Sequence, residues 1–231
     1  MATSITNREN APWYNRLFLP AYRVVDAARY TGAHPATVSS WHRRRNPVLP
    51  GRGPKQSLAY LELVEVAFVA FFRRAGVSMH RLRRAREYVA ASFECEYPFA
   101  EYKFKTEGLH ILMDAFPLPF GSTGEEIIVA DEAGQLAWNS LMGEQFAQFD
   151  YEFDLALTWH PAGRESTVRI DPRIAFGEPV VEGIPTRIIK GRWDAGESLA
   201  EVGEDYEIPY QVIVDALIFE GVHLETIASR G

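Results

Sequence analysis

The stretch 58–74 is apolar around almost its whole circumference when it is read as a helix. Between Leu58 and Phe72 its only charged residues are Glu62 and Glu65. Such a helix must be buried inside a domain or against a second subunit. The run is too short to span a bilayer, so no membrane segment is expected here. We therefore expect a domain built around this helix, with Ser57 as its N-cap.

The chain has 231 residues, which favours two compact modules over one or three. Hydrophobic residues make up 47% and charged residues 24%, a composition that excludes disordered and fibrous classes. Cys95 is the only cysteine, so no intramolecular disulfide can form, and the start Met-Ala-Thr-Ser has no signal-peptide pattern. These features predict a cytoplasmic protein.

The charge is divided unequally along the chain. Residues 1–92 hold 15 Lys and Arg against 5 Asp and Glu, a balance of +10, whereas residues 93–231 hold 9 against 26, a balance of -17. A basic module is the electrostatic footprint of a nucleic-acid binder, and an acidic one repels phosphate. The alternative is that surface charge differs between the modules without function.

Two short helices are predicted in the basic half. Residues 24–31 end at Gly32, a typical helix stop, and Pro35 begins a second helix that reaches about residue 44. Val38 and Trp41 form its inward stripe, which leaves Thr37, Ser40 and Arg44 on the opposite face. This is a helix-turn-helix pattern with groove-facing polar positions.

Basic residues surround this pattern. The triplet 43–45 is all arginine, and a Pro/Gly-rich stretch, 47–55, follows as a basic wing. A later helix, which Ser78 is expected to cap, carries four arginines that fit phosphate contact and a solvated face equally well: Arg81, Arg83, Arg84 and Arg86. The predicted DNA-binding residues are Thr37, Ser40, Arg43, Arg44, Arg45, Arg52 and Lys55.

Over residues 20–92 the chain resembles the DNA-binding domain of the MerR superfamily. The similarity rests on the segments Asp26-Ala27-Ala28-Arg29, Gly32, Thr37-Val38 with Trp41, and 58–86. The resemblance implies a winged helix-turn-helix fold that binds DNA.

The middle of the chain predicts a small antiparallel sheet. Aromatic and β-branched residues fill 103–116, 126–130 and 146–159, and the last of these alternates apolar and acidic positions from Phe149 to Leu155. Its carboxylates, Asp150, Glu152 and Asp154, stand about 6.6 Å apart on a strand, too far for one metal ion. Cys95 lies between two glutamates, which would raise a thiol pKa, so a nucleophilic role is not expected. We expect no metal, no cofactor and no enzymatic activity.

The C-terminal part predicts β-turns followed by helices. A strand at 166–172 and Gly/Pro-rich turns lead to a helix at 188–195, a helix from Ser198 to Tyr206, and a last helix at 210–219 that begins after Pro209. The last two helices carry no Lys or Arg and should not bind DNA. The last helix has more apolar surface than a module of this size can easily bury, which predicts self-association or a partner surface. The apolar residues concerned are Val212, Ile213, Ala216, Leu217 and Phe219.

Residues 166–220 resemble a bacterial family of antitoxin-like proteins of unknown function. The similarity rests on Ile170-Asp171-Pro172, Gly177 with Pro179, Gly183, and Thr186-Arg187. Together with the MerR-like part, the chain is similar to the VapB-type antitoxin group of type II toxin–antitoxin systems. This implies that it binds a PIN-like ribonuclease toxin and its own operator DNA. Predicted partner-binding residues are Glu201, Glu204, Tyr206, Tyr210 and Phe219.

The predicted architecture is α+β. It comprises a MerR-like winged helix-turn-helix domain at 1–92, a small antiparallel sheet region at 93–165, and a C-terminal β-turn and helix-turn-helix module at 166–231. A two-fold homodimer on a palindromic site is expected. The alternative is a MerR-type regulator whose middle region binds a small ligand in an aromatic pocket formed by Phe93, Tyr97, Phe99, Tyr102, Phe104 and Phe116.

Overall fold

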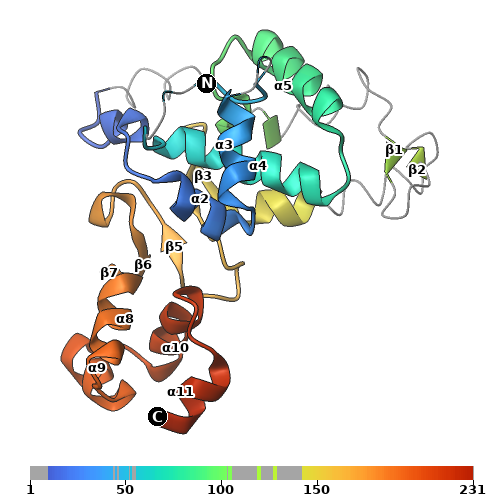
Figure 1. Cartoon of the computed structure of the whole chain (residues 1–231). Coiled ribbons are helices and arrows are strands. Elements are labelled where there is room, and N and C mark those ends of the chain that lie inside the picture. Colours follow the sequence, from blue (N-terminus) through green and yellow to red (C-terminus); the bar gives the residue numbers. More distant parts are fainter. Residues whose placement is uncertain are drawn as a thin grey trace. The chain divides into compact units, whose positions relative to one another are not determined.

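A computed structural model shows a mixed α/β protein (Figure 1). It describes residues 10–43, 45, 47–51, 53, 56–102, 104–105, 119–120, 127–128 and 142–230. The contacts divide the chain into two compact units, 1–156 and 157–231. The predicted domain boundaries at 92/93 and 165/166 stay predictions.

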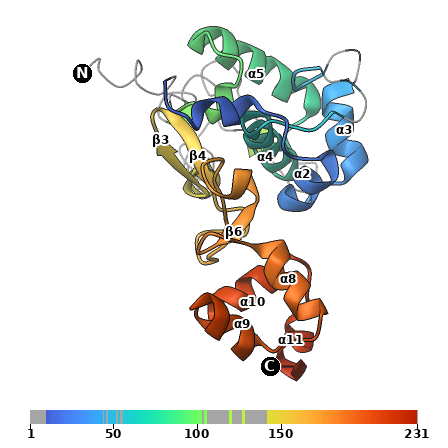
Figure 2. The same cartoon turned by 90° about the vertical axis from the view of Figure 1, so that its left-hand side faces the viewer.

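The N-terminal unit is organised around one buried helix, α4 (Tyr60–Arg74). Twelve of its 15 residues are buried, which confirms the expectation drawn from its composition. Four elements pack against it: η1 (Tyr14–Phe18), α2 (Val24–Thr31), α5 (Met79–Phe93) and η2 (Pro98–Ala100). Helices α2, α4 and α5 are labelled in Figures 1 and 2. Helix α3 (Pro35–Arg43) packs on α2.

Most of the predicted helix ends in this unit agree with the structure. Helix α2 ends at Gly32, which has a φ of 65° that suits glycine, and Ser78 accepts a hydrogen bond from the Arg81 N–H at the start of α5. The predicted Ser57 cap of α4 is wrong. The Leu58 backbone pairs with Tyr22 in an isolated β-bridge, so the chain stays extended and the helix begins two residues later than predicted.

The predicted strand at 146–159 is also wrong as a single element. Residues 142–147 are helical, β3 (Phe149–Glu152) follows, and the chain reverses at Phe153 and Asp154 into β4 (Leu155–Trp159). Both turn residues have positive φ, 52° and 62°, as a tight two-residue hairpin turn requires. The alternation of apolar and acidic residues continues through this turn and therefore hides it.

The strands form two antiparallel groups. In a short pair, β1 (Pro119–Phe120) is hydrogen-bonded to β2 (Ile127–Ile128). Strand β2 lies within the predicted strand at 126–130. A five-stranded sheet has the order β3-β4-β5-β6-β7, with β5 (Arg169–Ile170), β6 (Pro179–Val181) and β7 (Ile184–Pro185). Phe104 and Lys105 lie in a helical turn, not in the predicted strand 103–116, whose other residues lie outside the described ones.

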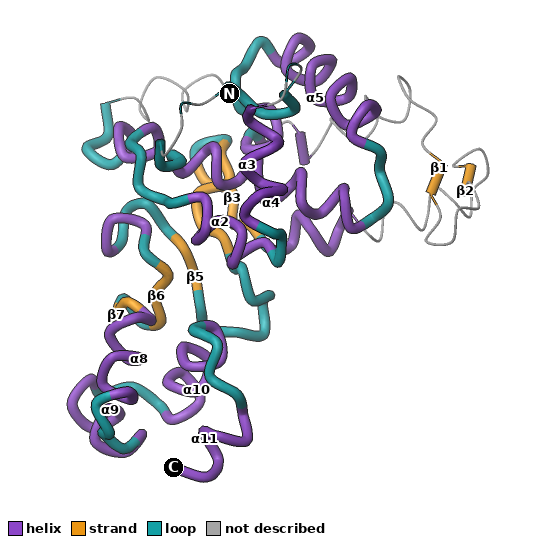
Figure 3. The backbone as a smooth tube through the Cα atoms, in the orientation of Figure 1, coloured by secondary structure: helices purple, strands orange, loops and turns teal. Residues whose placement is uncertain are grey.

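The C-terminal unit folds as a helical cluster after the last strands. Its helices are α8 (Thr186–Asp194), α9 (Leu199–Tyr206), α10 (Tyr210–Phe219) and α11 (Leu224–Arg230), coloured purple in Figure 3. The predicted bounds of α9 and α10 agree with the structure, whereas α8 begins two residues earlier than predicted and α11 was not predicted.

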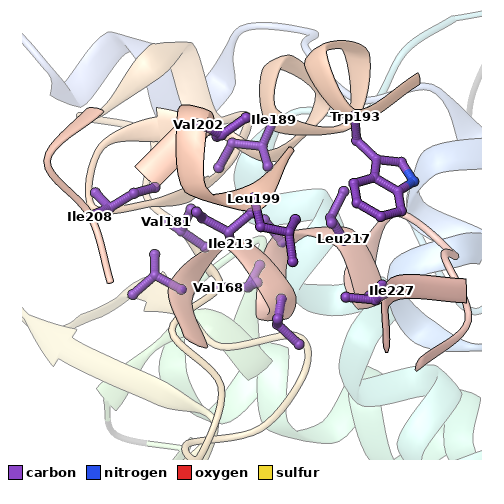
Figure 4. Close-up of a cluster of buried hydrophobic side chains, with 13 residues drawn as sticks. Val168, Val181, Ile189, Trp193, Leu199, Val202, Ile208, Ile213, Leu217 and Ile227 are labelled. Atoms are coloured by element: carbon purple, nitrogen blue, oxygen red, sulfur yellow. The ribbon is translucent and has the colours of Figure 1, made fainter. Parts of the chain in front are cut away.

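The core of this unit takes up the apolar side chains of α10. Val212, Ile213, Ala216 and Leu217 are buried among side chains from α8, α9 and the strands, and Ile227 of α11 joins them (Figure 4). The predicted uncovered apolar surface at these positions is therefore wrong. The exposed apolar area of α10 was overestimated because α11, which was not predicted from the sequence, packs against this core.

Candidate functional surfaces

Helices α2 and α3 form the candidate nucleic-acid surface. Ala27 and Ala28 of α2, and Val38 and Trp41 of α3, are buried, and the two helices pack against each other. Beyond α3, the backbone N–H groups of residues 48 and 49 donate to the Trp41 carbonyl at 3.0 and 3.2 Å. These bonds fix the path of the chain as it leaves the second helix, because they satisfy a helix-end carbonyl.

The predicted DNA-binding residues divide into described and undescribed positions. Thr37 and Arg43 are exposed on α3, and Ser40 is half-buried with its hydroxyl donating to the Thr37 carbonyl at 2.8 Å. Arg45 is exposed in the bend that follows. The remaining predicted contacts lie outside the described residues: Arg44, Arg52 and Lys55.

One arginine of α5, Arg86, pairs with a buried carboxylate. Arg86 forms an ion pair with Glu65 of α4 at 2.6 Å and donates to the Glu96 carbonyl at 2.6 Å. The other Glu65 oxygen accepts the Phe99 N–H at 2.7 Å. Burial raises the pKa of Glu65, and the neighbouring Arg86 opposes this shift. Arg86 is therefore a poor candidate for phosphate contact, while Arg84 stays exposed.

Two of the aromatic residues proposed to line a ligand pocket, Phe99 and Phe104, form packed core. Phe99 and Phe104 are fully buried, and their ring centroids lie 4.8 Å apart. Both rings contact the ring of Phe68 of α4. Phe149 stacks on Phe68 at a centroid distance of 5.3 Å. These rings fill the centre of the unit, whereas Phe93 and Tyr97 are half-buried and Tyr102 is exposed. Phe116 lies outside the described residues.

The predicted partner-binding aromatics occupy different environments. Tyr206 and Phe219 are partly buried against the core of the C-terminal unit. Tyr206 also lies beneath the guanidinium of Arg192, 5.2 Å from its ring centroid. Tyr210 is 55% exposed at the start of α10. Of the three, Tyr210 is the one that is positioned to meet another molecule.

The two predicted partner-binding glutamates also differ. Glu201 completes the capping box of α9, because its carboxylate accepts from the Ser198 N–H at 2.8 Å while Ser198 Oγ accepts the Glu201 N–H at 3.2 Å. The Ser198 N–H and the Ser198 hydroxyl both donate to the Glu201 carboxylate at 2.8 Å, and these two hydrogen bonds lower the pKa of Glu201. Both glutamates are exposed, but the Glu201 side chain also holds the start of α9. Glu204 instead lines an open groove on the surface.

This groove lies between α9 and the start of α10. It has a volume of about 390 Å³ and is lined by Leu199, Ala200, Gly203, Glu204 and Tyr210. Sequence reasoning selected two of these residues, Glu204 and Tyr210, but not the groove, since it forms only when the helices pack.

Two further observations bear on the class of the protein. Within the described ranges, no group of three or more His, Cys, Asp or Glu side chains is arranged to hold a metal ion. None of the helices in the described part of the chain is long and apolar enough to cross a membrane.

Known proteins match both the sequence and the fold. The family model described as "Protein of unknown function (DUF433)" matches residues 168–219, inside the segment 166–220 for which a resemblance to a family of unknown function was predicted. A Mycobacterium tuberculosis protein named "Putative antitoxin VapB45" is 24% identical over 226 residues, covering 87% of this chain and 94% of that protein. The crystal structure of Rv2018 from Mycobacterium tuberculosis matches with a TM-score of 0.65 at 23% identity, covering 87% of this chain and 99% of that one. The protein thus shares its fold with that structure.

Proposed function

We propose that this chain is the antitoxin of a type II toxin–antitoxin pair. In this proposal it neutralises a PIN-like ribonuclease toxin and binds operator DNA to regulate its own operon. The observation that carries the proposal is the similarity to the mycobacterial relative named "Putative antitoxin VapB45". This similarity extends over 87% of this chain. The proposal assigns the chain to the cytoplasm and gives it no catalytic activity of its own.

DNA binding is assigned to the N-terminal unit. The packed pair α2 and α3 leaves Thr37 and Arg43 exposed on the second helix, and the sequence of residues 1–92 has a charge balance of +10. A MerR-like winged helix-turn-helix would place this helix in the major groove and the basic wing on phosphate. Binding as a two-fold dimer would match a palindromic operator.

Toxin binding is assigned to the C-terminal unit. Helices α9 and α10 and the turn between them carry five carboxylates and no lysine or arginine. A ribonuclease must attract phosphate, so its substrate groove is expected to be basic. An acidic surface complements such a groove and competes with RNA for it.

Co-expression tests the proposal. The neighbouring gene of the operon is expressed in a bacterial host alone and together with this chain, and growth, RNA cleavage and co-purification are measured. We expect arrest by the toxin alone, relief by this chain, and a stable complex that shifts operator DNA. Arrest that this chain does not relieve, with no complex, would refute the neutralising role.

A further inference from the structure

The groove between α9 and α10 combines an apolar wall, a carboxylate and an exposed ring. Leu199 and Ala200 supply the apolar side, Glu204 the carboxylate, and Tyr210 the ring. Its volume of about 390 Å³ lies at the small end of the range for ligand pockets, about 300–1,000 Å³. It therefore has room for a long side chain with its neighbouring backbone.

The charge at this end of α9 is unfavourable for the isolated helix. Glu204, Asp205 and Glu207 lie at its C-terminal end, and its last turn holds no basic residue. Helix C-termini carry partial negative charge and favour cations, so carboxylates there oppose the helix dipole. Asp205 is neutralised by Arg192, but the described residues supply no ion-pair partner for Glu204 or Glu207. An incoming cation would remove this repulsion.

An arginine of α8 already occupies a comparable arrangement beside α9. Arg192 places its guanidinium over the Tyr206 ring and pairs with Asp205 and Glu197. Arginine suits such a site because its planar cation stacks on an aromatic face while it binds carboxylates. Next to Asp205 in sequence, Glu204 lines the groove together with Tyr210, and none of the described arginines is part of this lining. The groove thus combines a carboxylate and an aromatic ring, as Asp205 and Tyr206 do around Arg192.

We propose that the groove receives an arginine side chain from a basic segment of a protein partner. The guanidinium pairs with Glu204 and stacks on Tyr210, and the methylene groups lie against Leu199 and Ala200. This inference rests on the proposed function, because the partner is the protein that this chain neutralises. The groove is then the site at which this chain recognises that partner.

Titration with a small probe tests the groove without the partner. N-acetyl-L-argininamide is added to the full-length ¹⁵N-labelled protein, with N-acetyl-L-norleucinamide as an uncharged probe of similar length. We expect chemical-shift changes at the amides of Leu199, Ala200, Gly203, Glu204 and Tyr210 with the arginine probe only, and these should weaken as salt is added.

Variants separate the groove from general negative charge. Glu204→Gln and Tyr210→Ala should each weaken probe binding by about threefold or more, whereas Tyr210→Phe should keep it, because the ring is retained. Glu207→Gln is the matched control, since it removes the same charge from the same end of α9 outside the groove lining. Equal binding by Glu204→Gln and Glu207→Gln, or shifts confined to other surfaces, would overturn the proposal.

A second measurement keeps this inference distinct from the proposed function. Affinity for the protein encoded by the neighbouring gene is measured for the full-length chain and the same variants. If that protein does not bind at all while the arginine probe still occupies the groove, the proposed function fails and the groove assignment stands. If it binds all variants equally and the probe shows no groove shifts, the groove assignment fails and the proposed function stands.

Discussion

Replacing Arg86 by methionine should destabilise the N-terminal unit in a pH-dependent way. The substitution keeps an unbranched side chain in α5 but removes the guanidinium that pairs with the fully buried Glu65 at 2.6 Å. Glu65 would retain the backbone hydrogen bonds from Phe99, at 2.7 Å, and from Ala100. A buried carboxylate would then stand without its counter-charge.

The expected loss follows from this burial. Removing one partner of a buried ion pair typically costs about 3–5 kcal/mol, because the other charge is left uncompensated. Burial already raises the pKa of Glu65, and loss of Arg86 removes the opposing influence, so this pKa should rise further. Above the ordinary carboxyl range the native state then holds a proton that the unfolded state has lost. The free energy of unfolding therefore falls as pH rises.

Urea unfolding between pH 5 and pH 8 provides the assay, with hydrogen exchange read at peptides of α4 and α5. We expect the deficit of Arg86→Met relative to wild type to be small at pH 5 and to approach about 3–5 kcal/mol at pH 8. The double variant Glu65→Gln, Arg86→Met should recover part of the loss and remove the pH dependence, because an amide oxygen can still accept the Phe99 N–H. A deficit that is constant with pH, or a double variant no more stable than the single one, would refute this reasoning.

Three further predictions concern the helix ends and the two surfaces. Glu201→Lys should lower the melting temperature of the C-terminal unit, because it removes the capping box of α9, whereas Glu204→Lys should not. In the wild type, the stabilisation from the Glu201 cap should be lost as pH falls through the lowered pKa of Glu201, which thermal melts at pH 3 and pH 7 can check. Phe176→Gly should raise the free energy of unfolding by about 0.5–1 kcal/mol, measured by urea titration, because this side chain is 80% exposed at a φ of 55°, where glycine carries no strain. In gel shifts with the full chain, Arg44→Ala should relax the preference for operator over random DNA, whereas Arg52→Ala should weaken binding to both DNAs and reduce the salt slope by about one. Equal losses of affinity for both DNAs in Arg44→Ala would contradict the prediction that Arg44 reads bases in the DNA major groove.

Helix ends were predictable where the signal is local. Gly32 ends α2, Ser78 begins α5 and Ser198 begins α9, as their sequence positions indicate. Each of these depends on one residue's backbone preference or one side-chain hydrogen bond within a turn. The start of α4 was not predictable in this way, because it is set by the pairing of Leu58 with Tyr22, 36 residues earlier in the chain.

Backbone reversals without glycine escaped the sequence reasoning. The β3–β4 hairpin turns at Phe153 and Asp154, where Asn-Gly would be the usual signal. By contrast, the β6–β7 hairpin turns at Glu182 and Gly183, within the Gly/Pro-rich stretch where tight turns were predicted. A phenylalanine at positive φ costs energy locally, so its position is decided by the packing of the flanking strands, which composition does not record.

The candidate partner surface shows why a charge count alone is too coarse. In α9, α10 and the turn between them, five carboxylates appear equivalent in the sequence: Glu201, Glu204, Asp205, Glu207 and Asp215. The first caps a helix, Asp205 pairs with Arg192, and Asp215 accepts hydrogen bonds from Thr167 at 2.8 and 2.9 Å. Two remain without such partners among the described residues, and of these only Glu204 lines the groove that Tyr210 borders. In the proposed function, the negative balance of this half would attract a basic partner, and Glu204 and Tyr210 would recognise it at close range.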